Sequence, residues 1–164
     1  MENFCRRTLT LALLMGALLF TGPALADWMG TVERVKDGDT LVLQRGEERI
    51  TVRLTGIDAP ETAQRFGVDA AEFVRALVDG QTVTVRGTEQ DQYHRLLATI
   101  ELPDGRDLNR ELVRHGLAWW FFKYSSDRVL AELELEARLA RIGLWSQASP
   151  IPPWIFRHLK DLFH

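Results

Sequence analysis

The pattern of hydrophobic and polar residues is strand-like from Thr31 to Leu54, and the two kinds alternate strictly from Ile50 to Leu54. A two-residue alternation is typical of strands that bury one face. Asp37-Gly38 and Gly46 separate the apolar runs, and both are residues that favour turns. We therefore predict a three-strand meander in this segment. Its apolar positions are Val32, Val35, Leu41, Val42, Leu43, Ile50, Val52 and Leu54.

The spacing of apolar residues becomes helical over positions 70–77 and stops at Gly80. Strand-like alternation then returns at residues 82–86. It appears again at residues 96–102, where Pro103-Asp104-Gly105 predicts a turn. The meander is thus followed by one helix and a returning pair of strands.

Two further helices are predicted after this hairpin. Asp107 can cap a short helix that Gly116 closes, and Ser125 or Ser126 can open a longer one that reaches Arg141. A meander, a helix, a hairpin and two more helices favour an α+β domain. The predicted fold is a five-stranded OB-type β-barrel with three attached α-helices.

The first 26 residues have the pattern of a signal peptide. Arg6 and Arg7 precede an apolar run from Leu9 to Phe20, and a small-residue segment ending at Ala26 follows. The run is short beside the roughly 20 apolar residues that a membrane-spanning helix needs. We therefore predict cleavage near Ala26 and export, either to the periplasm or to the outside. The barrel domain then covers residues 27–148.

Residues 149–164 form a separate tail in this interpretation. The tail opens with a proline-rich segment, which favours an extended chain. From Ile155 onward its apolar residues gather on one helical side, which predicts a short amphipathic helix. Packing on the barrel, self-association and contact with a membrane surface stay open for this helix, with membrane contact the least favoured.

Composition and charge indicate a single globular domain and argue against some classes of nucleic-acid-binding protein. The chain is 46% hydrophobic and 26% charged, which fits one domain with a sizeable core. Loss of residues 1–26 changes the formal net charge from −3 to −4. An acidic chain is a poor histone-like binder, because such binding neutralises many phosphates. The single cysteine, Cys5, lies in the predicted signal peptide, so no disulfide is expected.

Four carboxylates lie close to the meander: Asp37 and Asp39 across a tight turn, and Asp58 and Glu61 on either side of Pro60 at the end of a strand. Each pair alone has an ordinary explanation as a hairpin turn or a helix cap. Arg53 favours a functional site over these structural explanations, because it lies on the polar face of the strand that leads to Asp58. Carboxylate oxygens suit hard cations such as calcium, and arginine can bind two phosphate oxygens at once. The combination indicates a metal and phosphate site.

Five blocks of the sequence resemble staphylococcal nuclease (thermonuclease) homologues in residue type and order. They are residues 35–40 (VKDGDT), 52–62 (VRLTGIDAPET), 91–98 (DQYHRLLA), 109–118 (NRELVRHGLA) and 144–146 (LWS). The resemblance implies an OB-type barrel. It also implies calcium-dependent hydrolysis of DNA and RNA to products that end in a 3'-phosphate.

The resemblance further implies a set of metal ligands. Asp39 and Asp58 are expected to bind calcium together with the backbone carbonyl of Ala59. Asp37 matches an acidic neighbour of the metal and has a weaker claim to be a ligand.

Catalytic roles follow from the same resemblance. Glu61 is expected to act on the attacking water, and Arg53 and Arg95 are expected to bind the scissile phosphate. The loop between Glu61 and Gly67 is shorter than in the family, so the substrate contacts made by a lysine-rich segment there are missing.

Aromatic residues are the candidates for substrate contact. Tyr93 and Tyr124 are expected to bind substrate, and Tyr124 matches a tyrosine that stacks on a base. Phe122 replaces a second tyrosine of the family, and His94 replaces a glycine beside Arg95. Both are weaker candidates.

The aromatic run from Trp119 to Tyr124 also has a structural interpretation. On a strand, its odd-numbered and even-numbered residues would lie on opposite faces, so only one set could meet a substrate. Burial in the core is therefore favoured for most of the run over base stacking.

The sequence thus predicts an exported, calcium-dependent endonuclease for DNA and RNA, with no stable protein partner. The alternative is a non-catalytic OB-fold module that binds nucleic acid or a protein. That alternative predicts the loss of one or more active groups, and all of them are present.

Overall fold

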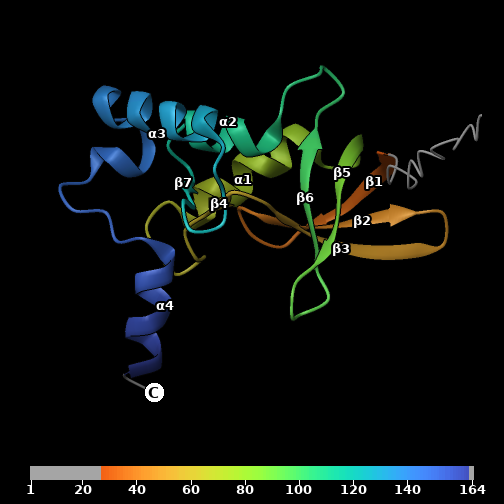
Figure 1. The fold of residues 1–164 in the computed structure, drawn as a ribbon, viewed down its shortest axis with the longest axis horizontal. Coiled ribbons are helices and arrows are strands. Elements are labelled where there is room, and N and C mark those ends of the chain that lie inside the picture. The colour runs from red at the N-terminus through yellow and green to blue at the C-terminus, as the bar shows by residue number, and fades with distance from the viewer. Residues whose placement is uncertain (1–26, 163–164) are drawn as a thin grey trace, which may run out of the picture.

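Five strands form a closed barrel in the order β1-β2-β3-β6-β5 in this computed structural model, which describes residues 27–162 (Figure 1). The predicted OB-type α+β barrel is therefore confirmed. A smaller sheet pairs β4 (Ile57–Asp58) with β7 (Trp119–Trp120). The barrel strands are β1 (Trp28–Val35), β2 (Thr40–Arg45), β3 (Glu48–Leu54), β5 (Thr82–Gln90) and β6 (Leu96–Glu101).

The barrel contains one parallel pair of strands, β3 and β6. β1, β2 and β3 form the predicted antiparallel meander, whereas β3 pairs with β6 in parallel, with Arg53 opposite Leu97. A parallel pair needs a long crossover, and here α1 (Gly67–Val78) and β5 lie between the two strands in sequence. The pairing places Arg53 beside the start of β6, which Arg95 directly precedes.

The barrel core follows the alternation of apolar residues. Leu41 and Leu43 of β2 and Val52 and Leu54 of β3 are at most 1% exposed. One face of α1 adds Ala70, Val74 and Val78, which recur at helical spacing and are fully buried. Period-two strands and a helix with one apolar stripe thus share a single core.

Aspartates begin the other two predicted helices. Asp107 caps α2 (Leu108–Arg114) by accepting a hydrogen bond from the backbone N–H of Arg110. Asp127 caps α3 (Arg128–Ala140) by accepting from Val129 N–H, so the expected start at Ser125 or Ser126 is wrong by one or two residues. The hydroxyl of Ser125 instead accepts from Asp127 N–H.

The aromatic run does not continue as a strand beyond Trp120. Phe121 N–H donates to Gly56 O, and Tyr124 N–H donates back to Phe121 O, so the chain turns. The expected alternation of faces through residue 124 is therefore wrong. The turn brings the rings of Phe121 and Tyr124 to a centroid distance of 4.8 Å, and Trp119 is buried.

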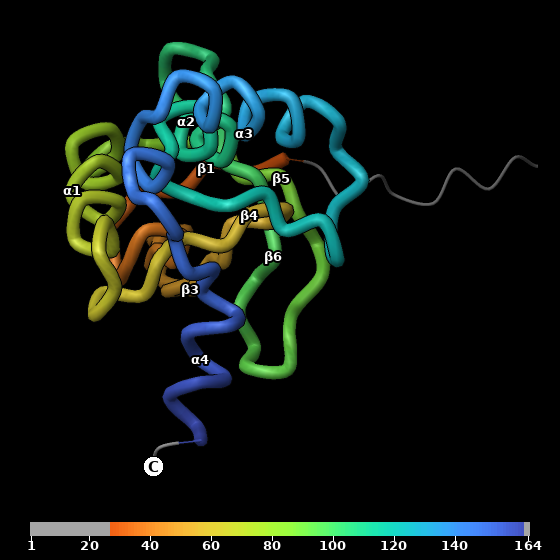
Figure 2. The backbone as a smooth tube through the Cα atoms, turned by 90° about the vertical axis from the view of Figure 1, so that its left-hand side faces the viewer, coloured from red at the N-terminus to blue at the C-terminus, as the bar shows by residue number. Residues whose placement is uncertain are grey.

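The chain ends in a short 3-10 helix, η1 (Gly143–Ser146), and a fourth helix, α4 (Pro153–Leu162). Figures 1 and 2 show α4 extending away from the barrel, with the C-terminus at its far end. Its attachment is aromatic: Trp154 stacks on Phe121 with centroids 5.1 Å apart and planes 13° apart. No helix within residues 27–162 is long and apolar enough to cross a membrane.

Candidate active site

A cleft of about 1170 Å³ opens at the end of the barrel where β3, β4 and the turn before β6 meet. All but two of the predicted site residues line it, and the exceptions are Phe122 and His94. Phe121 lines the cleft in place of Phe122 because of the turn after Trp120. The predicted residues that line it are Asp37, Asp39, Arg53, Asp58, Ala59, Glu61, Tyr93, Arg95 and Tyr124.

Asp39 is held in place by backbone hydrogen bonds from two segments. Its N–H donates to Asp37 Oδ1 at 3.0 Å, which closes the turn before β2. Its own Oδ2 accepts from Ala59 N–H at 2.7 Å, so the carboxylate bridges this turn and the segment after β4. Asp37 therefore acts here as a turn residue, and Asp39 is the carboxylate presented to the cleft.

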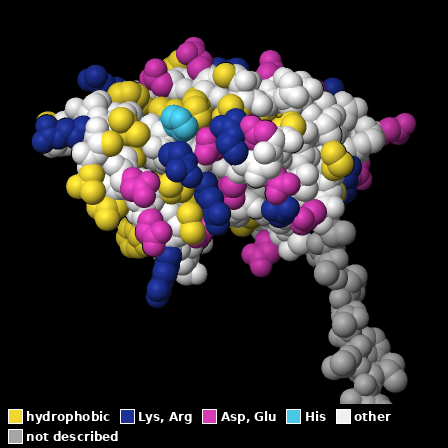
Figure 3. Space-filling model, turned by 90° about the horizontal axis from the view of Figure 1, so that it is seen from above, with side chains coloured by type: hydrophobic (Ala, Val, Ile, Leu, Met, Phe, Trp, Pro, Cys, Tyr) yellow, Lys and Arg dark blue, Asp and Glu magenta, His cyan; other side chains and the backbone are white. Residues whose placement is uncertain are grey.

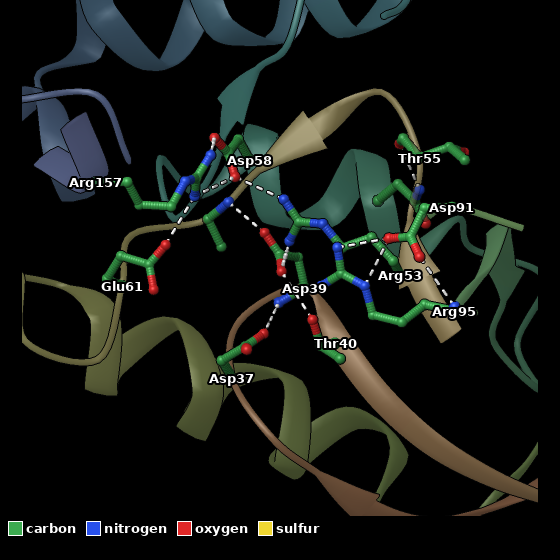
Figure 4. Close-up of polar contacts among 12 residues, drawn as sticks. Asp37, Asp39, Thr40, Arg53, Thr55, Asp58, Glu61, Asp91, Arg95 and Arg157 are labelled. Atoms are coloured by element: carbon green, nitrogen blue, oxygen red, sulfur yellow. Dashed lines mark hydrogen bonds and ion pairs between the residues drawn. The ribbon is translucent and has the colours of Figure 1, made fainter. Parts of the chain in front are cut away.

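Arg53 joins the two buried carboxylates. Its Nη1 forms an ion pair with Asp39 Oδ1, and its Nη2 lies 2.6 Å from Asp58 Oδ1 (Figure 4). Asp58 is 0% exposed and Asp39 is 3% exposed, and buried carboxylates require such positive partners. Burial lowers the pKa of Arg53, and the Asp58 carboxylate offsets part of this effect. The guanidinium still stays protonated at any working pH.

Arg95 is anchored by Asp91, which was not among the predicted site residues. Asp91 Oδ2 lies 2.7 Å from both Nε and Nη2 of Arg95, while its Oδ1 accepts from the N–H groups of Tyr93 and Arg95. Burial raises the pKa of Asp91, but these hydrogen bonds outweigh it and the net pKa is lowered. An aspartate four residues before an arginine was the available signal in the sequence.

The turn that carries Arg95 contains a residue in the left-handed region. His94 has φ of 59°, a conformation that favours glycine. His94 is exposed and lies outside the cleft lining, so its expected substrate contact has no support in the geometry. Tyr93 is 69% exposed beside it, and the Arg95 guanidinium lies 5.5 Å from the centre of its ring.

Arg157 of α4 also reaches the cleft. Its Nη2 lies 2.8 Å from Asp58 Oδ2, and its Nη1 lies 2.7 Å from Glu61 Oε1 and 3.3 Å from Asp58 Oδ1 (Figure 4). Sequence reasoning missed this residue because 99 positions separate it from Asp58. Its place on the polar side of a short helix was the only signal, and His158 and Lys160 of that helix share it.

The oxygen donors fit a hard divalent cation. Asp39 lies in the bend before β2 and Asp58 lies in the short strand β4. Both contact Arg53, so their carboxylates converge on one cationic group. Hard cations such as calcium favour carboxylate and carbonyl oxygens, and Ala59 follows Asp58 directly. Within residues 27–162 no three His, Cys, Asp or Glu side chains form a metal-binding group. Two carboxylates would therefore need backbone, water or phosphate oxygens to complete a metal site.

One known protein family matches a long segment of this chain. The family model described as "Staphylococcal nuclease homologue" matches residues 51–147, which include Arg53, Asp58, Glu61 and Arg95. The chain belongs to this family.

Two bacterial relatives of this staphylococcal nuclease homologue match it over most of their own lengths. A protein of Escherichia coli O157:H7 named "uncharacterized endonuclease" is 44% identical over 143 residues, which cover 87% of this chain and 94% of the relative. The "micrococcal nuclease" of Shigella flexneri is 38% identical over 150 residues, covering 85% and 86% of the two chains.

Two parts of the site lie outside the matched segment of this staphylococcal nuclease homologue. Asp37 and Asp39 precede residue 51, and Arg157 follows residue 147. Asp39 is nevertheless tied to the matched segment by Arg53 and by Ala59 N–H. Arg157 is tied to it by Asp58 and Glu61.

Proposed function

We propose that the protein is an exported, calcium-dependent nuclease that hydrolyses DNA and RNA to products ending in a 3'-phosphate. That the chain is a nuclease of the staphylococcal nuclease family rests on the family match and on relatives named endonuclease and micrococcal nuclease. The observation that carries the finer proposal is the convergence of two buried aspartates, Glu61 and the arginines Arg53 and Arg95 on one cleft.

Arg53 and Arg95 would bind the scissile phosphate in this proposal. They approach from adjacent segments, since Arg53 is on β3 and Arg95 directly precedes the strand that pairs with it. A guanidinium can donate two parallel hydrogen bonds to phosphate oxygens, and these bonds strengthen as negative charge builds up in the transition state. The neighbouring carboxylates fix the direction of both guanidiniums before a substrate arrives.

Asp39, Asp58 and the carbonyl of Ala59 would hold calcium. A bound divalent cation neutralises charge on the phosphate and orients water. Such a cation would help an anionic substrate to bind, because the acidic residues that line the cleft outnumber the basic ones. The acidic residues are Asp37, Asp39, Asp58, Glu61, Glu89 and Asp91, and the basic residues are Arg53, Arg86, Arg95 and Arg157.

Glu61 would orient the attacking water and accept its proton. It follows β4 by only three positions and lines the same cleft as Asp58, with a side chain that is 40% exposed. A carboxylate that reaches both solvent and the site can exchange its proton with water after each turnover. Attack of water on phosphorus with loss of the 5' oxygen leaves the phosphate on the 3' side.

Exposed aromatic side chains favour substrates whose bases are accessible. Tyr93 is 69% exposed and Tyr124 is 78% exposed, and both line the cleft. Stacking of a base on such a ring is worth about 1–3 kcal/mol and is tolerant of sequence. Bases within a duplex are already stacked, so we expect single strands and fraying ends to be cut first.

Export is part of the proposal because of the predicted signal peptide. Residues 1–26 lie outside the described part of the structure, so the support is their sequence pattern alone. A periplasmic or secreted location would supply calcium at higher concentration than a cytoplasm does.

A digestion assay on the mature chain tests the function directly. Heat-denatured DNA, duplex DNA and RNA would each be incubated with calcium or with a chelator, and acid-soluble nucleotides and end groups would be measured. We expect calcium-dependent release, fastest from denatured DNA, with 3'-phosphate ends. Nucleotide binding without cleavage would instead favour the non-catalytic binding module.

A further inference from the structure

Arg157 contacts the same carboxylates that the proposed function assigns to metal binding and to the attacking water. It is bonded to both oxygens of Asp58 and to Oε1 of Glu61, at 2.7–3.3 Å. Figure 4 shows its guanidinium between these two carboxylates, on the side of Asp58 away from Arg53. A positive group in this position occupies oxygen lone pairs that a divalent cation would need.

The position of Arg157 is set by the packing of its helix. Trp154, one turn earlier on α4, stacks on Phe121 and meets Trp119 edge-on with centroids 5.7 Å apart. Gln64 Nε2 also donates to Ile151 O at 2.9 Å, which ties the segment before α4 to the loop after Glu61. The helix therefore presents Arg157 to the site from a fixed attachment at its N-terminal end.

Arg157 differs from Arg53 in how firmly it is held. The Arg53 side chain is 14% exposed within the barrel, whereas the Arg157 side chain is 44% exposed on a helix that extends into solvent. Arg157 can thus leave the carboxylates by rotating its own side chain, with α4 still attached. Arg53 has no comparable route into solvent without disturbing the pair of buried aspartates.

We propose that Arg157 is an additional active-site residue: an internal counter-cation that occupies Asp58 and Glu61 and is displaced when a divalent cation binds. The inference rests on the proposed calcium site at Asp39 and Asp58. A cation that binds Asp58 meets the positive charge of Arg157 at close range, and the two compete for the same carboxylate. Arg157 therefore weakens metal binding and sets the calcium concentration that this nuclease requires.

The ion pair between Arg157 and Asp58 also stabilises the folded protein when no metal is bound. Asp58 is fully buried, and a buried carboxylate is costly unless it is paired. Arg53 and Arg157 together supply that pairing. Removal of Arg157 should therefore lower the stability of the metal-free protein and, at the same time, raise its affinity for metal.

Calcium titration without nucleic acid tests this inference. The dissociation constant would be measured by calorimetry for the wild-type chain, Arg157→Gln and Arg157→Lys. Lys160→Gln is the matched control, because it removes one positive charge from the same exposed helix without touching the cleft. We expect Arg157→Gln to bind calcium at least tenfold more tightly, because removing a unit positive charge about 6 Å from a divalent cation implies roughly that factor even at the dielectric constant of bulk water, about 80. Arg157→Lys and Lys160→Gln should stay close to the wild type.

Thermal unfolding provides a second measurement that does not depend on activity. In a chelator, Arg157→Gln should have a lower Tm than the wild type, because Asp58 has lost a partner. Added calcium should raise its Tm by more than it raises that of the wild type, since the stabilisation by a bound ligand grows with the logarithm of the ligand concentration divided by the dissociation constant. Equal calcium-induced rises in Tm would overturn the inference.

The outcomes separate this inference from the proposed function. Unchanged or weaker calcium binding in Arg157→Gln, with calcium-dependent cleavage intact in the wild type, overturns the counter-cation role alone. If Arg157→Gln has unchanged calcium affinity but binds a nucleotide more weakly, Arg157 is a phosphate contact instead. Absence of calcium binding in both proteins overturns the inference together with the calcium requirement.

Discussion

At the scale of single residues, the carboxylates of the cleft differ in what surrounds them. Asp58 is fully buried between two guanidiniums, whereas Glu61 is 40% exposed and bonded to Arg157. A buried, doubly paired carboxylate suits a fixed ligand. An exposed one suits a group that gains and loses a proton in each turnover. The proposed division of roles between ligand and base follows from these environments.

Glu61→Gln tests the role of the base. The substitution keeps the shape and the hydrogen-bonding oxygen but removes the group that accepts a proton, so kcat should fall by about 100-fold or more. Calcium and nucleotide affinity should be retained, and both would be measured alongside turnover. Glu47→Gln, at an exposed position in the β2–β3 hairpin, is the control. Unchanged turnover would remove Glu61 from the mechanism.

Arg95→Ala tests transition-state stabilisation. Loss of one charged donor to the phosphate should lower kcat by roughly 100-fold to 1000-fold. Asp91→Asn should cause a smaller loss of the same kind, because it loosens Arg95 without removing its charge. Steady-state kinetics on denatured DNA would separate kcat from KM, with Arg75→Ala as the control for loss of an exposed arginine. A change confined to KM would contradict the assignment.

At the scale of elements, α3 joins the barrel to the C-terminal aromatic cluster. Leu130, Leu133 and Ala137 bury one face of the helix, and Arg138 lies over the rings of Trp119 and Trp145. Glu134 lies on the same side as Arg138, at a distance of 3.3 Å. Burial raises the pKa of Glu134 above its ordinary value of 4.5, and the neighbouring Arg138 offsets only part of that rise.

Glu134→Gln should therefore stabilise the protein at neutral pH. A raised pKa in the folded state means that ionisation of Glu134 favours unfolding as the pH rises through that value. The advantage of glutamine should be largest near pH 7 and shrink as the pH falls toward 4.5, where Glu134 is protonated in the folded protein. Melting temperatures from pH 4 to 7 would measure this, with Glu136→Gln as an exposed control. A Tm difference that grows toward low pH would contradict the sign.

Asn109 is the residue that joins α2 to the barrel. It is 1% exposed, donates from Nδ2 to Thr55 O at 2.8 Å, and accepts at Oδ1 from Ile100 N–H at 3.3 Å. These bonds link the backbone just after β3 to the backbone of β6. Arg53 lies on β3, and Arg95 directly precedes β6. The amide thus supports the site from behind without lining the cleft.

Asn109→Ala should lower stability without touching the cleft residues. It leaves buried backbone groups without partners, at a cost of about 1–3 kcal/mol each. Urea unfolding would measure the loss, and exposed Gln44→Ala should change stability much less. Retained stability in Asn109→Ala would show that water replaces the amide.

At the scale of the whole molecule, the protein is acidic although its substrates are polyanions. Acidic and basic side chains are interspersed on the face shown in Figure 3. Binding through a broad basic surface is therefore not its mode of recognition on that face. The positive charge needed for phosphate is local, in the arginines of the cleft and in the proposed metal.

Calcium should therefore stabilise the folded chain. Binding to the native state alone contributes about 2.7 kcal/mol at a concentration 100 times the dissociation constant. Asp58→Asn should abolish the calcium-induced rise in Tm, and Asp79→Asn, at an exposed helix end, should keep it. The rise would be followed by thermal unfolding across calcium concentrations. A full rise in Asp58→Asn would exclude Asp58 as a ligand.

Much of the fold and the site could be predicted because both depend on local patterns. Period-two alternation marks the buried face of β3, a short apolar run marks β2, and helical spacing marks the buried face of α1, since each pattern reports which side meets the core. Asp39, Arg53, Asp58 and Glu61 also lie within the short sequence motifs that resemble the family. These features survive in the sequence because each is decided within a few residues.

Other features depended on contacts between distant segments, which no local pattern encodes. The parallel pairing of β3 with β6 brings Arg53 and Arg95 together, and the turn after Trp120 exchanges Phe122 for Phe121 in the cleft. Arg157 reaches Asp58 across 99 residues because aromatic packing of Trp154 directs α4 toward the site. The sequence by itself determined the barrel and most of the acidic and basic groups of the site, but not the roles of Asp91 and Arg157. Only the tertiary structure decided which cation lies on which carboxylate, because that depends on how separate elements pack.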